Sequence, residues 1–213
     1  MVSNRYNCFR MREVHFIHSL LALGVGFIIF CIPSNAEDMA RWQPNEKQVR
    51  REGMPPEFVG ATPEGLQYSY FPKVAGSVRD PKGSRRNGWG FSCEKDAMSD
   101  EKHCWLTSLS NSLSMRFEDV GSIKPDVICT SFHKDPAHQA MIRIDQLPPL
   151  TSDPQGCFPG KSLFGQLFAG QKAVIRSFGG GVGSPSDFSE ELQTFHPTYN
   201  LMLHVTGLPP SAR

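Results

Sequence analysis

Trp89-Gly90-Phe91-Ser92-Cys93 is followed, after ten polar-rich residues, by Cys104-Trp105-Leu106-Thr107-Ser108-Leu109. Large apolar residues alternate with small ones in the first stretch, which is the period of a strand with one buried face. Two such strands around a charged loop predict an antiparallel hairpin, with Cys93 and Cys104 opposite each other at its neck. Paired positions of this kind can bring two Cβ atoms within the ~3.5–4.5 Å that a disulfide needs.

Four further segments have apolar runs or alternation and are predicted to be strands, at residues 127–132, 140–145, 173–176 and 201–205. Residues 161–170 predict a short helix that ends at Gly170. The chain also contains 19 Gly and 17 Pro, which separate short apolar segments and favour a β-rich protein with long loops. We therefore expect a mostly β protein, an antiparallel β-sandwich over residues 88–208 with one short helix.

Residues 37–87, ahead of this domain, are expected to form a flexible, proline-rich and irregular N-terminal lead-in. Its prolines, among them Pro44, Pro55 and Pro63, cannot donate a backbone hydrogen bond to a sheet. The alternating residues 66–70 predict one possible strand, which Pro72 closes.

Residues 1–36 have the pattern of a secretory signal peptide. Three arginines precede an apolar run of 13 residues, 20–32, and small residues lie before an expected cleavage site after Ala36. An uncleaved anchor is the alternative, although the apolar run is shorter than the ~20 residues needed to span a bilayer. Cleavage would place the remaining chain in the periplasm or outside the cell, with no stable membrane insertion.

Charge balance argues against nucleic acid as a partner. The chain has 22 basic and 21 acidic residues, and the first 36 hold three arginines and one glutamate, so the remainder has a formal charge of −1. A nucleic-acid-binding protein needs a basic stripe. Four cysteines remain after cleavage, and in an exported protein they predict two disulfides with three possible connectivities. Zinc is the competing explanation, but the sequence has no CxxC pair.

Known catalytic motifs do not match this chain. The stretch from Gly156 to Ser162 lacks the spacing of a phosphate-binding loop, and no GxSxG elbow frames a serine. His133 and His138 are five residues apart, which is not the i, i+4 spacing of a helical metal pair. We therefore expect no cofactor, no metal site and no catalytic residue.

The order of segments over residues 89–205 resembles the invasion-associated locus B family of exported bacterial proteins. The resemblance rests on the hairpin with its two cysteines, on IRID followed by two prolines, on Gly156-Cys157, and on LFGQLFAGQKAVIR. It implies a β-sandwich-like periplasmic or surface protein that takes part in host-cell entry or envelope function, with no enzymatic site to carry over. Family members often have a second cysteine near the Gly-Cys pair. Cys157 has no such neighbour here, so Cys129 is its expected partner.

These observations predict a non-catalytic interaction protein that binds an envelope or host-surface protein. The hairpin loop is the expected contact, through Glu94, Lys95, Asp96, Asp100, Glu101 and Lys102. Loops held on a rigid sandwich are common recognition sites. Two alternatives remain: a periplasmic small-molecule binding module with a pocket near Trp89, Phe91 and Trp105, and a divergent hydrolase with dispersed catalytic residues.

Overall fold

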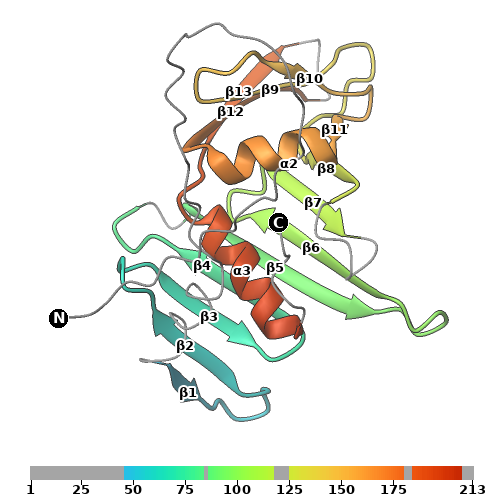
Figure 1. Ribbon diagram of the computed structural model, residues 1–213. Coiled ribbons are helices and arrows are strands. Elements are labelled where there is room, and N and C mark those ends of the chain that lie inside the picture. Colours follow the sequence, from blue (N-terminus) through green and yellow to red (C-terminus); the bar gives the residue numbers. More distant parts are fainter. Residues whose placement is uncertain (1–45, 84–85, 118–124, 180–183, 208–213) are drawn as a thin grey trace, which may run out of the picture.

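A computed structural model describes residues 46–83, 86–117, 125–179 and 184–207 (Figure 1). These residues form thirteen strands and two helices. The predicted signal peptide and residues 37–45 lie outside the described residues. Within the described ranges, no helix has the length and apolar character needed to cross a membrane.

The strands form two antiparallel sheets, so the prediction of a mostly β, antiparallel fold is confirmed. The larger sheet has nine strands in the order β1-β2-β3-β4-β5-β6-β7-β8-β11, and the smaller has four in the order β10-β9-β12-β13. The strands of the larger sheet are β1 (Lys47–Val49), β2 (Glu57–Ala61), β3 (Gln67–Phe71), β4 (Ala75–Arg79), β5 (Gly88–Lys95), β6 (Lys102–Ser108), β7 (Leu113–Phe117), β8 (Val127–Thr130) and β11 (Cys157–Pro159).

The smaller sheet lies beside the larger one near β8 and β11 (Figure 1). Its strands are β9 (Met141–Ile144), β10 (Leu150–Thr151), β12 (Lys172–Phe178) and β13 (Pro185–Glu191). Helix α2 (Gly160–Ala169) follows β11 and closely matches the predicted helix. Helix α3 (Phe195–Thr206) ends the described chain, and Gly207 terminates it at φ 74°.

The prediction of an irregular lead-in over residues 37–87 needs correction for its described part, which begins at residue 46. Strands β1 to β4 occupy residues 47–79, and β4 pairs with β5, so the sheet starts well before residue 88. The prolines of this region lie between the strands, where they remove no ladder hydrogen bond. Strand β3 coincides with the one strand predicted here, at residues 66–70, whereas β1, β2 and β4 are short and show little of the alternation that marks a strand.

The C-terminal segment is a second correction, because residues 201–205 are helical. Phe195, Thr198, Tyr199 and Met202 are all buried and follow the i, i+3, i+4, i+7 spacing of a helix face. Pro197 is the third residue of α3, where its missing N–H would have had no acceptor within the helix. It is therefore compatible with the helix and does not interrupt the segment.

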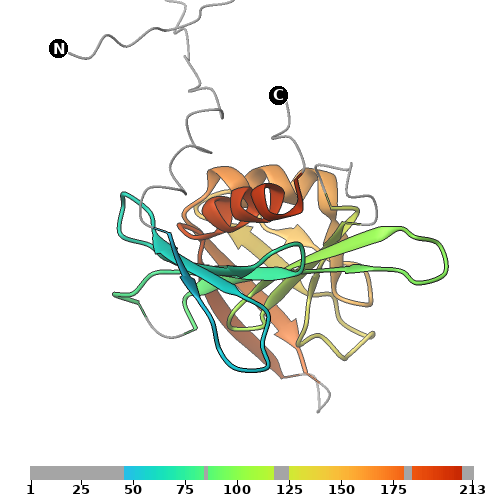
Figure 2. The same ribbon diagram turned by 90° about the horizontal axis from the view of Figure 1, so that it is seen from below.

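The core lies between the larger sheet and the two helices, which both cover the same side of that sheet (Figure 2). Phe91, Leu106, Met115 and Ile128 are register partners across β5 to β8, and all are buried. Helix α3 packs on β4 and β5, where the rings of Trp89 and Phe195 meet edge to face at 4.8 Å. Alternate residues on these strands therefore face away from the helices.

A buried carboxylate connects the two sheets. Glu190 of β13 is 4% exposed and accepts hydrogen bonds from Ser112, at 2.5 Å, and from Ser110. Both serines lie in or beside the turn between β6 and β7, about 80 residues earlier in the chain, and Ser108 bonds to both of them. A buried carboxylate is costly unless it is hydrogen-bonded, so this serine cluster is part of what holds the sheets together.

Candidate functional site: the projecting hairpin

The β5–β6 hairpin extends beyond the rest of the larger sheet (Figures 1 and 2). β5 and β6 pair from Trp89↔Ser108 to Lys95↔Lys102. On one side, β4 pairs no further along the hairpin than Ser92, and on the other side β7 pairs no further than Cys104. Among the described residues, no strand therefore lies beside the end of the hairpin, residues 94–103.

A disulfide closes the base of this projection. Cys93 and Cys104 are direct register partners with Cα atoms 4.1 Å apart, the pairing that the hairpin pattern predicts. Both are buried, at 7% and 1% exposure, so the bond lies in the core under the projecting arm. Because it joins β5 and β6 where the pairing with the flanking strands ends, it fixes the direction in which the end of the hairpin leaves the body.

The tip of the hairpin is a hydrogen-bonded turn organised by Asp96. Its Oδ1 accepts the backbone N–H groups of Met98 and Ser99, both at 2.8 Å. The backbone of Asp96 bonds to Glu101 and Asp100, and Asp100 has a positive φ of 62°. Hydrogen bonds from Ser99 and then Met98 lower the pKa of the Asp96 carboxyl. The tip is thus ordered from within, although it is exposed to solvent.

The six residues predicted as contacts lie together around this tip, but several also shape it. Lys95 and Asp100 form an ion pair with 2.5 Å between Nζ and Oδ1. Glu101 lies 3.9 Å from His103 Nε2, while Glu94 is the register partner of His103. Lys102 is partly buried, and this burial, with the nearby charge of Lys73, lowers its pKa. Glu94 is the one of the six that is exposed and has no part in the turn.

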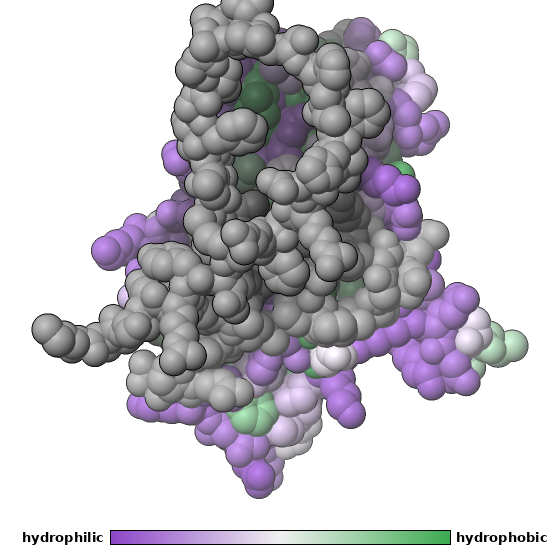
Figure 3. Space-filling model, in the orientation of Figure 1, coloured by the Kyte–Doolittle hydropathy of each residue, from purple (hydrophilic) through white to green (hydrophobic). Residues whose placement is uncertain are grey.

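Met98 lies at this tip as well, and no sequence pattern singles it out. Its side chain is 95% exposed, the highest value among the exposed large hydrophobic residues. Figure 3 shows the projection as a hydrophilic surface with a pale hydrophobic cap at its end. The available signal was a single methionine in an otherwise polar loop. The side chain of Met98 therefore stays hydrated in the folded protein, and its adaptable thioether is accessible for contact with another molecule.

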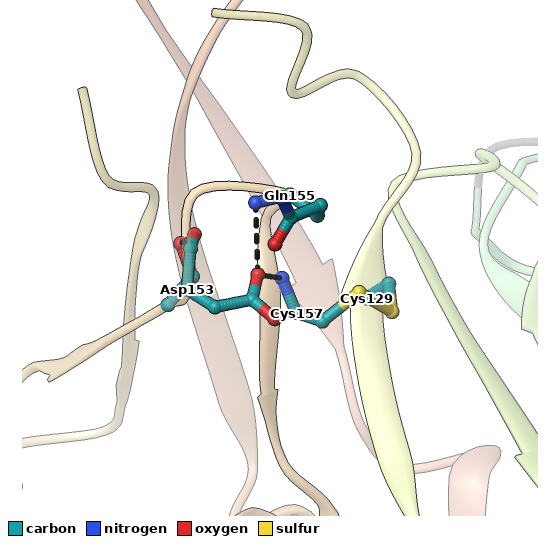
Figure 4. Close-up of a disulfide and its surroundings, with 5 residues drawn as sticks. Cys129, Asp153, Gln155 and Cys157 are labelled. Carbon is teal, nitrogen blue, oxygen red and sulfur yellow. Dashed lines mark hydrogen bonds between the residues drawn. A yellow bond between two sulfur atoms is a disulfide. The ribbon is translucent and has the colours of Figure 1, made fainter. Parts of the chain in front are cut away.

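The second disulfide joins Cys129 of β8 to Cys157 of β11, register partners with Cα atoms 4.0 Å apart (Figure 4). Asp153 accepts the N–H groups of Gln155 and Cys157, at 2.9 and 2.8 Å, and closes the turn before β11. This bond holds the edge strand from which α2 starts. Two disulfides are typical of a protein in an oxidising compartment.

The structure does not bring the predicted aromatic pocket together. Trp89 and Phe91 are buried in the core, at 0% and 5% exposure. Trp105 belongs to the opposite face of the sheet, where the guanidinium of Arg116 lies 5.8 Å from its ring centroid. The reason is the two-residue period of strands, because inward positions in β6 are Cys104 and Leu106.

In the part of the chain that the structure describes, no group of three or more His, Cys, Asp or Glu residues could hold a metal ion. His133 and His138 lie on the same segment, but His138 pairs with Asp135 at 2.8 Å and stacks on Phe178.

Comparisons of the whole chain with protein-family models, curated proteins and solved structures gave no match.

Proposed function

We propose that this protein is a non-catalytic interaction protein of the bacterial envelope or cell surface, and that the β5–β6 hairpin is its binding arm. The observation that carries the proposal is the arm itself: it projects past its neighbouring strands, is anchored by a buried disulfide, and presents Met98 at 95% exposure. The expected partner is an envelope or host-surface protein, met after export and cleavage near Ala36.

The order within the arm supports binding. A flexible loop loses conformational entropy when it docks, and this loss weakens association. Here the Asp96 turn and the Cys93–Cys104 bond have already removed much of that freedom. Methionine adapts its shape to an apolar surface, and the Lys95–Asp100 pair and Glu94 beside it supply a polar rim. The resemblance to the invasion-associated locus B family is in keeping with such a role.

Site-specific photocrosslinking tests the proposal. A diazirine-bearing methionine analogue is placed at position 98 in the full chain, and the same analogue is placed at position 54 as a matched control. Met54 is also exposed, at 61%, but lies in the β1–β2 connection. In cells, position 98 should give a discrete protein adduct that position 54 does not give.

A Met98→Asp variant should abolish capture of the crosslinked partner by the purified protein, because it places a charge where an apolar contact is expected. Met54→Asp should leave capture unchanged. Equal adducts from both positions, or full capture by Met98→Asp, would refute the hairpin as the binding arm. Substrate turnover by the purified wild-type protein would refute the non-catalytic part of the proposal.

A further inference from the structure

A hollow lies at the other end of the larger sheet, over β1 to β4. It is open to solvent and has a volume of about 860 Å³. Figure 2 shows β1 and β2 running obliquely to the rest of the larger sheet, with the end that carries their connection on the side away from the helices. The size is within the ~300–1,000 Å³ typical of small-molecule sites.

The register explains which side chains line the hollow. Tyr68 and Val78 point into the core, so Gln67, Ser69 and Arg79 point to the opposite face. Lys47, Val59 and Ser69 are successive register partners across β1, β2 and β3, and Ala61, Gln67 and Arg79 form the next row. The floor is therefore a small, mixed surface, with Lys47 at one side and Arg79 at the other.

Two cations, Lys47 and Arg79, lie at the sides of this hollow. Both are exposed, and within the described residues neither Lys47 nor Arg79 makes an ion pair. The two acids that line the hollow are already engaged: Glu57 pairs with Arg51 at 3.4 Å, and Glu46 accepts the Tyr70 hydroxyl at 3.0 Å. The lining as a whole has one positive charge more than it has negative charges.

We propose that this hollow binds an amphiphilic organic anion. Its charged group, a carboxylate or a phosphate, would lie against Lys47 or Arg79, with Gln67 and Ser69 as hydrogen-bonding groups between them. Its apolar body would cover Val49, Val59 and Ala61, which line the floor, the two valines half-buried and the alanine exposed. This site is separate from the hairpin and does not depend on the function proposed for it.

The experiment is isothermal titration calorimetry of the purified protein with decanoate and with decyl phosphate, each below its micelle concentration. Either ligand should bind at one site per chain. Decanol lacks the charged group and inorganic phosphate lacks the apolar chain, so both should bind more weakly. The better of the two anions identifies the charged group. Binding of decanol as tightly as decanoate would overturn the role of the cations.

Charge-removing variants locate the site. Lys47→Gln and Arg79→Gln should each weaken decanoate binding about threefold, and the double variant about tenfold, as exposed ion pairs allow. Lys82→Gln removes the same charge in a turn outside the hollow and should bind like the wild type. An equal loss in Lys82→Gln, or no loss in the double variant, would overturn the proposal.

Two further measurements separate a lost site from a lost fold. Lys47→Arg and Arg79→Lys keep the charges and should keep most of the affinity. Amide NMR signals of Val59 and Ser69 should shift on titration with decanoate, while those of the hairpin tip stay in place. A Met98→Asp variant should bind decanoate normally, so failure of the hairpin proposal and failure of this one are distinguishable. Shifts confined to the tip would refute the location.

Discussion

Replacing both cysteines of the Cys93–Cys104 disulfide with alanine should destabilise the protein more than the same change at Cys129–Cys157. Loop length alone predicts the opposite. The two bonds close sequence separations of 11 and 28 residues. On the chain-entropy model these loops correspond to about 2.8 and about 3.6 kcal/mol of unfolding free energy.

Burial reverses this order. Cys93 and Cys104 are 7% and 1% exposed within the core, so each alanine also leaves a small cavity. A cavity of about one methyl group or more costs about 1 kcal/mol, which brings the total for this pair to about 5 kcal/mol. Cys129 and Cys157 are half-buried on the other face, and their sulfurs leave little empty volume when they are removed. The expected difference between the two double variants is about 1 kcal/mol.

Urea unfolding followed by tryptophan fluorescence measures this difference. The unfolding free energy of both variants must depend on urea concentration with the same slope. A different slope would mean that the substitution also changed the unfolded state. Lower stability for the Cys129→Ala, Cys157→Ala variant would show that loop closure outweighs core packing in this sheet, and the reasoning above would be wrong.

Three other outcomes are expected. Gly160→Ala should cost about 1–3 kcal/mol of unfolding free energy, because its Cβ would lie 2.1 Å from the carbonyl oxygen of Pro125. Gly165→Ala in the same helix has open space around the new Cβ and should gain about 1 kcal/mol. Thermal melts of the two variants check this difference. Glu190→Ala should cost about 2–3 kcal/mol in urea unfolding, because it leaves buried serine hydroxyls without their acceptor; an unchanged midpoint would contradict this. Because the pKa of Asp96 is lowered, the stability that it gives to the tip is complete above its ordinary pKa of 3.8 and is lost as pH falls through the folded-state pKa. NMR titration of this carboxyl should give a midpoint below 3.8. A midpoint above 3.8 would exclude the turn centred on Asp96.

The hairpin was predictable because its signals are local. Alternation, a charged loop and two cysteines all lie within residues 89–109, and strands that follow each other in the sequence usually pair with each other. The short helix α2 was predictable for the same reason, since Leu163, Leu167 and Gly170 define one face and one stop.

Other elements depend on contacts that no local pattern reports. Leu201, Leu203 and Val205 alternate like a strand, but Tyr199 and Met202 are buried with them because α3 has the core on most of its circumference. The hollow needs Lys47 and Arg79, which are 32 positions apart in the sequence and come to line one surface only through the pairing of β1 to β4. The exposure of the Met98 side chain could not be predicted without knowing how far the hairpin extends past its neighbouring strands.

The position of α3 has a consequence for the order in which the chain is completed. This helix contains the last described residues, yet it covers strands β4 and β5, which are synthesised more than 100 residues earlier. Until the C-terminal residues have left the ribosome, Trp89 and Val78 have no cover for their apolar face. The early strands therefore cannot reach their final stability until α3, the last described element, has been synthesised.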